Sequence, residues 1–142
     1  MRFMVIIKAN ADTEAGIMPS SELIAAMGRF NDALIDAGVL LAADGLHPSS
    51  KGTRVWLQNG KHVIKDGPFS ETKELIAGYW LIQVKSHDEA LEWVKRIPLE
   101  EGDQIELRRV FEASDFAVDT VTEEHLAKEQ AWRDANQKPL TN

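Results

Sequence analysis

The stretch GYWLIQVKSHDEALEWVKRIP, residues 78–98, contains a strand pattern followed at once by a helix pattern. Residues 79–84 form an almost unbroken apolar run, which is typical of a strand buried in a sheet. Ser86 and Glu89 have the spacing of a helix capping box, and Pro98 cannot continue a helix. The apolar face of this helix consists of Ala90, Leu91, Val94 and Ile97. The stretch therefore predicts a strand–helix unit.

The rest of the chain predicts a second unit of this kind and a hairpin. Residues 3–7 form a short apolar strand pattern, and residues 20–37 form an amphipathic helix that Gly38 can end. Asn59-Gly60 stands between two strand patterns, which is a strong signal for a tight hairpin turn. The other expected elements are strands at residues 39–43, 53–57, 61–65 and 105–111, a loop at 9–19 and a helix at 122–135.

This order of elements predicts an α+β fold. A β-α-β unit, a hairpin and a β-α-β unit follow one another, which is the ferredoxin-like order, an antiparallel sheet with both helices on one face. Several of the strands are apolar on both faces, so the sheet face without helices also needs a cover. We expect a second copy of the chain to supply it, which makes the protein a homodimer.

Composition excludes several classes of function. The chain has 142 residues, no cysteine and a formal net charge of −7. A chain of this length can form a core without crosslinks, and the lack of cysteine excludes disulfides, thiolate metal sites and cysteine nucleophiles. The negative charge disfavours binding to nucleic acid, and no apolar run approaches the length of a membrane span. We expect a cytoplasmic protein that binds neither nucleic acid nor membranes.

Two loops contain the residues best suited to chemistry. His47 precedes Pro48, which favours an extended backbone and projects the imidazole away from the chain. The second loop brings acidic, basic and hydroxyl side chains together within residues 66–74, and carboxylates beside an ammonium group shift pKa values and suit proton transfer. A solvated loop with ordinary ion pairs is the alternative. The histidines are too scattered for a zinc site and no phosphate-binding glycine motif occurs, so no metal or cofactor is expected.

The second loop also carries a resemblance. Its sequence DGPFSETKE, residues 66–74, resembles the DGPF motif of the YCII-related (YciI-like) family. Further matching positions are Gly45-Leu46-His47-Pro48, Arg54, Gly78-Tyr79-Trp80, Pro98 and Glu106-Leu107-Arg108. The resemblance covers residues 1–112 and implies a ferredoxin-like domain there. Residues 113–142 then form a C-terminal tail with one helix.

The resemblance implies that two such subunits pair into a dimeric α+β barrel. The family's own activity is largely unassigned, while the wider superfamily of such barrels includes small-molecule lyases, isomerases and cofactor-free monooxygenases. Related proteins often stand beside extracytoplasmic-function sigma factors, which suggests a regulatory context. One departure matters: the YciI branch has a helix histidine paired with an aspartate, and these positions fall near Met27 and Asp36 here. Without the histidine this dyad cannot operate as such.

Three hypotheses follow. In the first, the protein is a cofactor-free lyase or isomerase, in which Asp66 or His47 moves a proton of a small substrate. Arg54 and Arg108 would hold an anionic oxygen, and nearby charges would set the local field. The full expected substrate-binding set is Arg54, Arg108, Glu71, Lys73 and Glu74.

The other two hypotheses need no reaction. In one, the protein is a ligand-binding or regulatory module associated with sigma-factor signalling, and the loop shapes an interface or an effector pocket. In the other, the loop is purely structural: Gly67 and Pro68 form a turn, Phe69 fills the core, and Glu71 pairs with Lys73.

Overall fold

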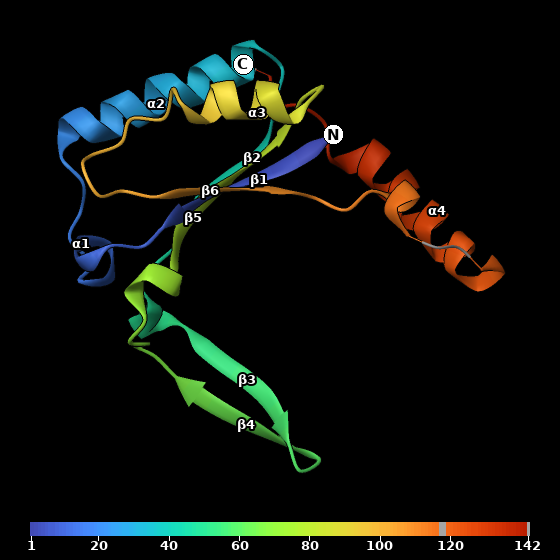
Figure 1. The fold of residues 1–142 in the computed structure, drawn as a ribbon, viewed down its shortest axis with the longest axis horizontal. Helices are drawn as coiled ribbons and strands as arrows, with labels where there is room; N and C mark the ends of the chain where they lie inside the picture. The colour runs from blue at the N-terminus through green and yellow to red at the C-terminus, as the bar shows by residue number, and fades with distance from the viewer. Residues whose placement is uncertain (117–118, 142) are drawn as a thin grey trace.

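A computed structural model describes residues 1–116 and 119–141 of the chain. Its main sheet has four strands in the order β2-β5-β1-β6, and every neighbouring pair is antiparallel. These strands are β1 (Arg2–Lys8), β2 (Leu40–Gly45), β5 (Ile76–Gln83) and β6 (Ile105–Arg109). Each strand–helix–strand unit skips one strand position, so that β5 lies between β1 and β2, and β1 between β5 and β6 (Figure 1). The predicted α+β class and antiparallel sheet are confirmed.

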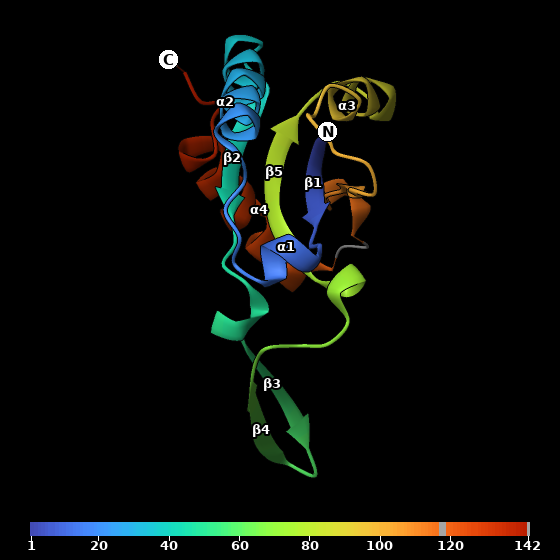
Figure 2. The same cartoon turned by 90° about the vertical axis from the view of Figure 1, so that its left-hand side faces the viewer.

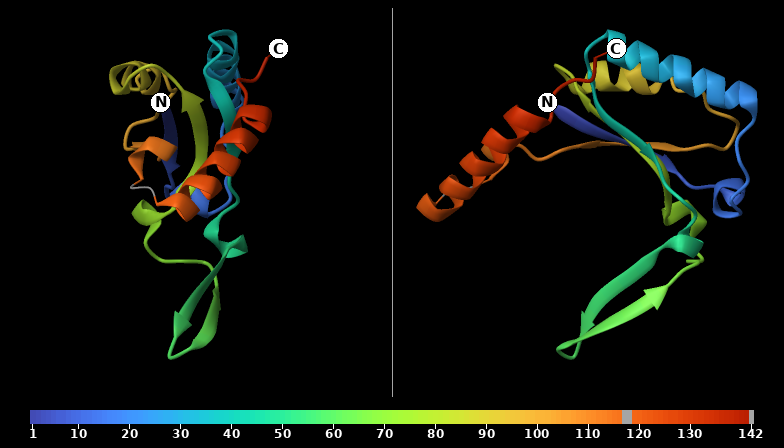
Figure 3. Two further views of the ribbon diagram at one scale, coloured as in Figure 1. Left: turned by 90° about the vertical axis from the view of Figure 1, so that its right-hand side faces the viewer. Right: turned by 180° about the vertical axis from the view of Figure 1, so that it is seen from behind.

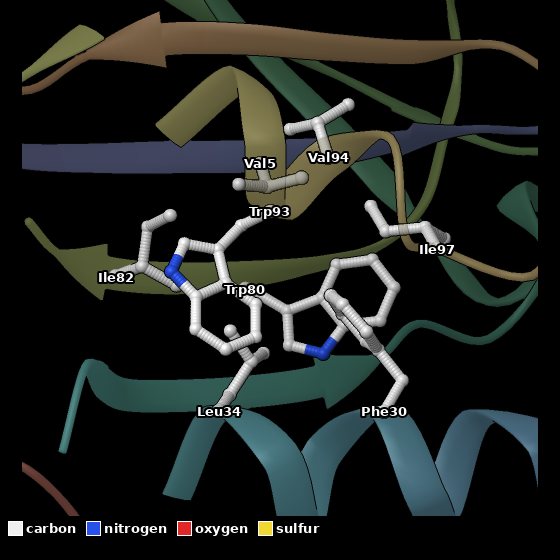
Figure 4. Close-up of a pocket in the computed structure, with 8 residues that line it drawn as sticks. All are labelled: Val5, Phe30, Leu34, Trp80, Ile82, Trp93, Val94 and Ile97. Atoms are coloured by element: carbon white, nitrogen blue, oxygen red, sulfur yellow. The ribbon is translucent and has the colours of Figure 1, made fainter. Parts of the chain in front are cut away.

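Two helices cover one face of this sheet: α2 (Ser21–Asp36) and α3 (His87–Val94), seen side by side above the strands in Figure 2. The core lies between them and the sheet. Phe30 of α2 meets Trp80 of β5 edge to face, with ring centroids 5.3 Å apart, and Trp93 of α3 at 6.4 Å (Figure 4). The other side chains that Figure 4 shows there are Val5, Leu34, Ile82, Val94 and Ile97.

The helix ends follow from local sequence. The side chain of Ser86 accepts a hydrogen bond from the Glu89 backbone, as the capping box requires. The reciprocal bond differs, because the Glu89 carboxylate accepts from the backbone N–H of Lys85 rather than of Ser86. Gly38 follows α2 with φ of +68°, the left-handed conformation that ends helices, as predicted. α3 stops at Val94, three residues before the predicted end at Ile97.

The hairpin is a separate two-stranded sheet. Its strands, β3 (Thr53–Gln58) and β4 (Lys61–Asp66), project away from the four-stranded sheet (Figures 1 and 2). Asn59 and Gly60 both have positive φ, 50° and 76°, so the tight turn predicted from the Asn-Gly pair is confirmed.

The segment expected to be a loop at residues 9–19 contains a short helix, α1 (Ala11–Glu14). Asn10 and Thr13 form a reciprocal capping box at its start, and a helix of four residues is too short to show apolar periodicity. The expected loop is therefore wrong at these four residues. The last strand is also shorter than expected, since β6 ends at Arg109.

The C-terminal helix α4 (Thr120–Asn136) forms close to the predicted residues 122–135. Its end is tied to the first strand, because the Arg2 guanidinium donates to Gln137 at 2.7 Å and contacts Glu112 at 3.1 Å. The backbone N–H of Leu140 also donates to the carbonyl of Leu40. The tail therefore packs on its own chain, next to the face of the sheet that α2 and α3 leave open.

Register identifies the residues of this open sheet face. Met4 pairs with Leu81 and Arg108, and Ile6 pairs with Tyr79 and Glu106. The sheet of the single chain is open rather than closed into a barrel. The predicted dimeric barrel and the cover by a second copy stay predictions.

Candidate functional site

A cavity of about 550 Å³ lies where α1, the start of α2 and the end of β2 approach one another. The segments 17–20 and 98–100 complete its wall. Its apolar lining consists of Ile7, Ile17, Met18, Pro19, Leu23, Met27, Ala43, Ala77, Trp80, Pro98 and Leu99. The volume and the mainly apolar wall are those of a site for a small organic molecule.

One polar pair lies within this apolar wall. Trp80 Nε1 donates a hydrogen bond to the side-chain oxygen of Asn31 at 2.7 Å. Because an indole N–H can only donate, the bond occupies the amide oxygen and leaves the Asn31 amide N–H groups as donors for a ligand. The indole of Trp80 also packs edge to face against Phe30.

A second polar pair lies at the border of the cavity. Tyr79 and Asp44 face each other across β5 and β2, and the phenol donates to Asp44 Oδ2 at 2.8 Å. This hydrogen bond, together with the negative charge of Asp44 and some loss of solvation, raises the pKa of Tyr79 above its usual 10.0. Tyr79 is therefore a hydrogen-bond donor at neutral pH. Register puts both side chains on the open sheet face, away from α2, so they meet the cavity at the sheet edge.

The lining is acidic overall. Lys8 is its one base, and its amine lies 3.3 Å from Glu106. The acids in the lining are Asp12, Asp44, Glu100 and Asp103. The resulting negative potential favours an uncharged or cationic molecule over an anion.

The loop at residues 66–74 serves to join other segments. Gly67 donates its N–H to the carbonyl of Gly52, and a Cβ at Gly67 would lie 1.8 Å from the carbonyl oxygen of Ser49. Phe69 donates its N–H to Ser49 Oγ at 3.0 Å, and Ser49 donates to the Glu14 carboxylate through both its N–H and its hydroxyl. The loop therefore locks the hairpin root to α1.

The comparisons with known proteins identify the family of the chain. The model of the YCII-related domain matches residues 1–114, most of the chain. The chain belongs to the YCII-related family. An uncharacterised protein of Rhizobium meliloti is similar to it, with 36% identity over 61 residues, which are 43% of this chain and 49% of that protein. The matched segment thus spans about half the length of this relative.

In this YCII-related protein, the residues predicted to act at the site do not line the cavity. Asp66 ends β4 and accepts a hydrogen bond from the Thr53 hydroxyl at 2.8 Å. Arg54 stacks on the ring of Phe69 at 3.8 Å. His47 is exposed in the loop after β2. Asp66, Arg54 and Phe69 therefore gather at the hairpin root, outside the cavity wall.

The remaining predicted substrate-binding residues lie apart from this root group or on its surface. Arg108 is on β6, the edge strand farthest from β2, and its nearest acid is Glu106 at 3.7 Å. Glu71, Lys73 and Glu74 are exposed in or beside the short 3₁₀ turn Thr72–Glu74. The acid–base roles given to Asp66 and His47, and the substrate contacts of the other five, stay predictions.

Met27, near the position of the branch's helix histidine, lines the cavity. Asp36, near the position of the partner aspartate, is nine residues further along the same helix, about 14 Å by the rise of an α-helix. Within one chain these two positions cannot form a dyad.

Sequence reasoning assigned no site role to the cavity residues Asn31, Asp44 and Tyr79. Asn31 and Asp44 belong to no motif, and Tyr79 stands out only as part of the matching segment Gly78-Tyr79-Trp80. Among residues 1–116 and 119–141, no group of three acidic or histidine side chains could hold a metal ion. The described helices include none that is long and apolar enough to cross a membrane.

Proposed function

We propose that this YCII-related protein binds a small organic molecule in the cavity beside α1 and α2. The observation that carries the proposal is the cavity itself, about 550 Å³, with a mainly apolar wall and a few fixed polar groups. An apolar body would lie against Met27 and Leu23, and a polar group would meet the amide of Asn31. The acidic lining favours an uncharged or cationic ligand.

A thermal-shift comparison tests this proposal. The probes are a bicyclic aromatic amine, alcohol and carboxylate that share one carbon skeleton. A ligand at 100 times its Kd stabilises the fold by about 2.7 kcal/mol, which raises Tm by about 8 °C for a chain of this size. We expect the amine and the alcohol to raise Tm and the carboxylate to leave it unchanged.

Two matched variants place the binding site. Ile17→Arg adds a cation at the cavity lip, where Ile17 is 58% exposed, and should abolish the shift produced by the amine. Ile24→Arg makes the same change at a residue that is 51% exposed on α2 and outside the lining, and should preserve it. The proposal fails if none of the three probes raises Tm, or if Ile17→Arg responds as the wild type does.

A second candidate function is proton transfer on the bound molecule, a lyase or isomerase reaction without a cofactor. It is favoured by the hydrogen bond between Tyr79 and Asp44, which places a carboxylate and a protonated phenol at the cavity border. Exchange of ligand C–H for deuterium in D₂O, followed by NMR, would detect it. Loss of exchange in Asp44→Asn would assign the base there, and loss in Asp66→Asn would assign it to the residue predicted from sequence.

We also propose that the protein works as a homodimer in which two open sheet faces meet, forming the dimeric α+β barrel that the family resemblance implies. The support is the apolar row on that face, where Met4 pairs with Leu81 and Ile6 pairs with Tyr79. A role as a regulatory module near a sigma factor, with the ligand as effector, stays a prediction. A cytoplasmic location stays a prediction.

A further inference from the structure

The hairpin lacks the support that a two-stranded sheet normally requires. Residues 53–66, called the hairpin arm below, form β3, β4 and their turn. Every residue of β3 is exposed, and in β4 only Val63 is partly buried. An isolated hairpin is marginally stable at best in water. The arm therefore needs a surface to pack on, and its own chain holds it only at the root.

The two faces of the hairpin arm differ in chemistry. Val55 pairs with Ile64, and Leu57 follows on the same face. These three side chains are 59%, 67% and 67% exposed, in that order, and they form a continuous apolar stripe. The opposite face is basic, with Arg54, Lys61 and Lys65 around Trp56.

The helix α4 lies at the other end of the open sheet face and has the opposite charge. Figure 3 shows α4 and the hairpin arm projecting from the two ends of the sheet on the side away from α2 and α3. Trp132 is exposed on α4, although the helix end is tied to the sheet through Arg2. The acids of α4 are Glu123, Glu124, Glu129 and Asp134, against the bases Lys128 and Arg133.

We propose that the hairpin arm docks on a second copy of this chain, with its apolar stripe buried at that copy's open sheet face and its basic side chains next to that copy's α4. This inference rests on the proposed homodimer and adds its orientation. A two-fold axis makes the contact reciprocal, so that each copy gives one arm and receives one. Opposite charges favour an arm beside α4, whereas two arms side by side would bring Arg54, Lys61 and Lys65 together with their own copies.

Light scattering on two matched variants tests the docking. Leu57→Glu places a carboxylate on the apolar stripe, and Gln58→Glu places the same charge at the next residue, on the opposite face. Both residues are exposed in the single chain, so neither change should disturb the subunit itself. We expect the wild type and Gln58→Glu to be dimers and Leu57→Glu to be a monomer with an unchanged circular dichroism spectrum.

Crosslinking then tests the orientation. Because the chain has no cysteine, single introduced cysteines are the only targets for a short bismaleimide. Gln58→Cys, on the basic face of the arm, mixed with Trp132→Cys should yield a crosslinked pair, and Leu57→Cys mixed with Trp132→Cys should yield much less. Crosslinking of Gln58→Cys with itself alone would overturn the orientation.

The outcomes separate the two proposals. A monomeric wild type overturns both the homodimer and the arm docking. A Leu57→Glu dimer as tight as the wild type overturns the docking and leaves the homodimer standing. Ligand binding is tested separately by the Ile17→Arg comparison, since none of the described side chains of the hairpin arm or α4 lines the cavity.

Discussion

Replacing Gly67 with alanine tests whether the DGPF loop holds the structure together. Gly67 lies against the backbone of Ser49, and an added Cβ would sit 1.8 Å from the Ser49 carbonyl oxygen. The carbonyl belongs to the 3₁₀ turn Ser49–Lys51, whose first residue is bound to Glu14, so it cannot move freely. We expect the loop to separate from this turn in Gly67→Ala.

The energetic cost follows from the bonds at stake. Separation breaks the Gly67–Gly52 backbone bond and the bond from the Phe69 N–H to Ser49, each about 1 kcal/mol. It also removes the ring of Phe69 from beneath Arg54, an exposed cation–π contact of about 0.5–1 kcal/mol. The free energy of unfolding should therefore fall by about 3 kcal/mol, which lowers Tm by about 9 °C.

Urea denaturation followed by tryptophan fluorescence, together with calorimetry, measures the effect. Gly45→Ala is the matched control, because a Cβ there meets no atom within 4 Å and the backbone is not left-handed. We expect the control to unfold close to the wild type. A Gly67→Ala protein as stable as Gly45→Ala would refute the structural role of the loop, and a loss of function without loss of stability would point to chemistry there.

Three further predictions concern single residues. The phenol of Tyr79 should titrate above pH 10, and Asp44→Asn should return it toward its ordinary value. Tyr79 is the only tyrosine, so ultraviolet absorbance reports it directly, and the stability it contributes should be present below pH 10 and lost as pH rises through the raised pKa. Gly28→Ala, in the exposed interior of α2 with open space around it, should stabilise the protein by about 0.5–1 kcal/mol in calorimetry. Trp80→Phe should cost about 1–3 kcal/mol in urea denaturation by leaving the Asn31 oxygen unpaired, and the double change with Asn31→Leu should recover part of this loss.

Local features of the fold were predictable because neighbouring residues decide them. Asn59-Gly60 can adopt positive φ without help from the rest of the chain, and Ser86 caps a helix that starts beside it. Apolar periodicity likewise indicated α2 and the order of strands. The exceptions are short or long-range: α1 is only four residues long, and the end of β6 depends on its pairing with β1.

The candidate site was less predictable, because residues distant in the sequence form it. The sequence pointed to Asp66, Glu71, Lys73 and Glu74 because they are close together in the chain. In the structure they are exposed at the root of the hairpin. The cavity instead gathers Asn31 from α2, Asp44 from β2 and Tyr79 from β5, which no spacing connects. Glu14 belongs to no sequence motif, yet it holds Ser49 and through it the DGPF loop.

By itself, the sequence determined the α+β class, the two strand–helix units, the tight hairpin turn and the family, because each depends on local backbone preference or on a contiguous motif. Only the tertiary structure decided where the cavity lies, that the DGPF loop joins the hairpin to α1, and that the hairpin arm and α4 flank one open sheet face. Those features arise from contacts between residues far apart in the chain, so no local sequence pattern can show them.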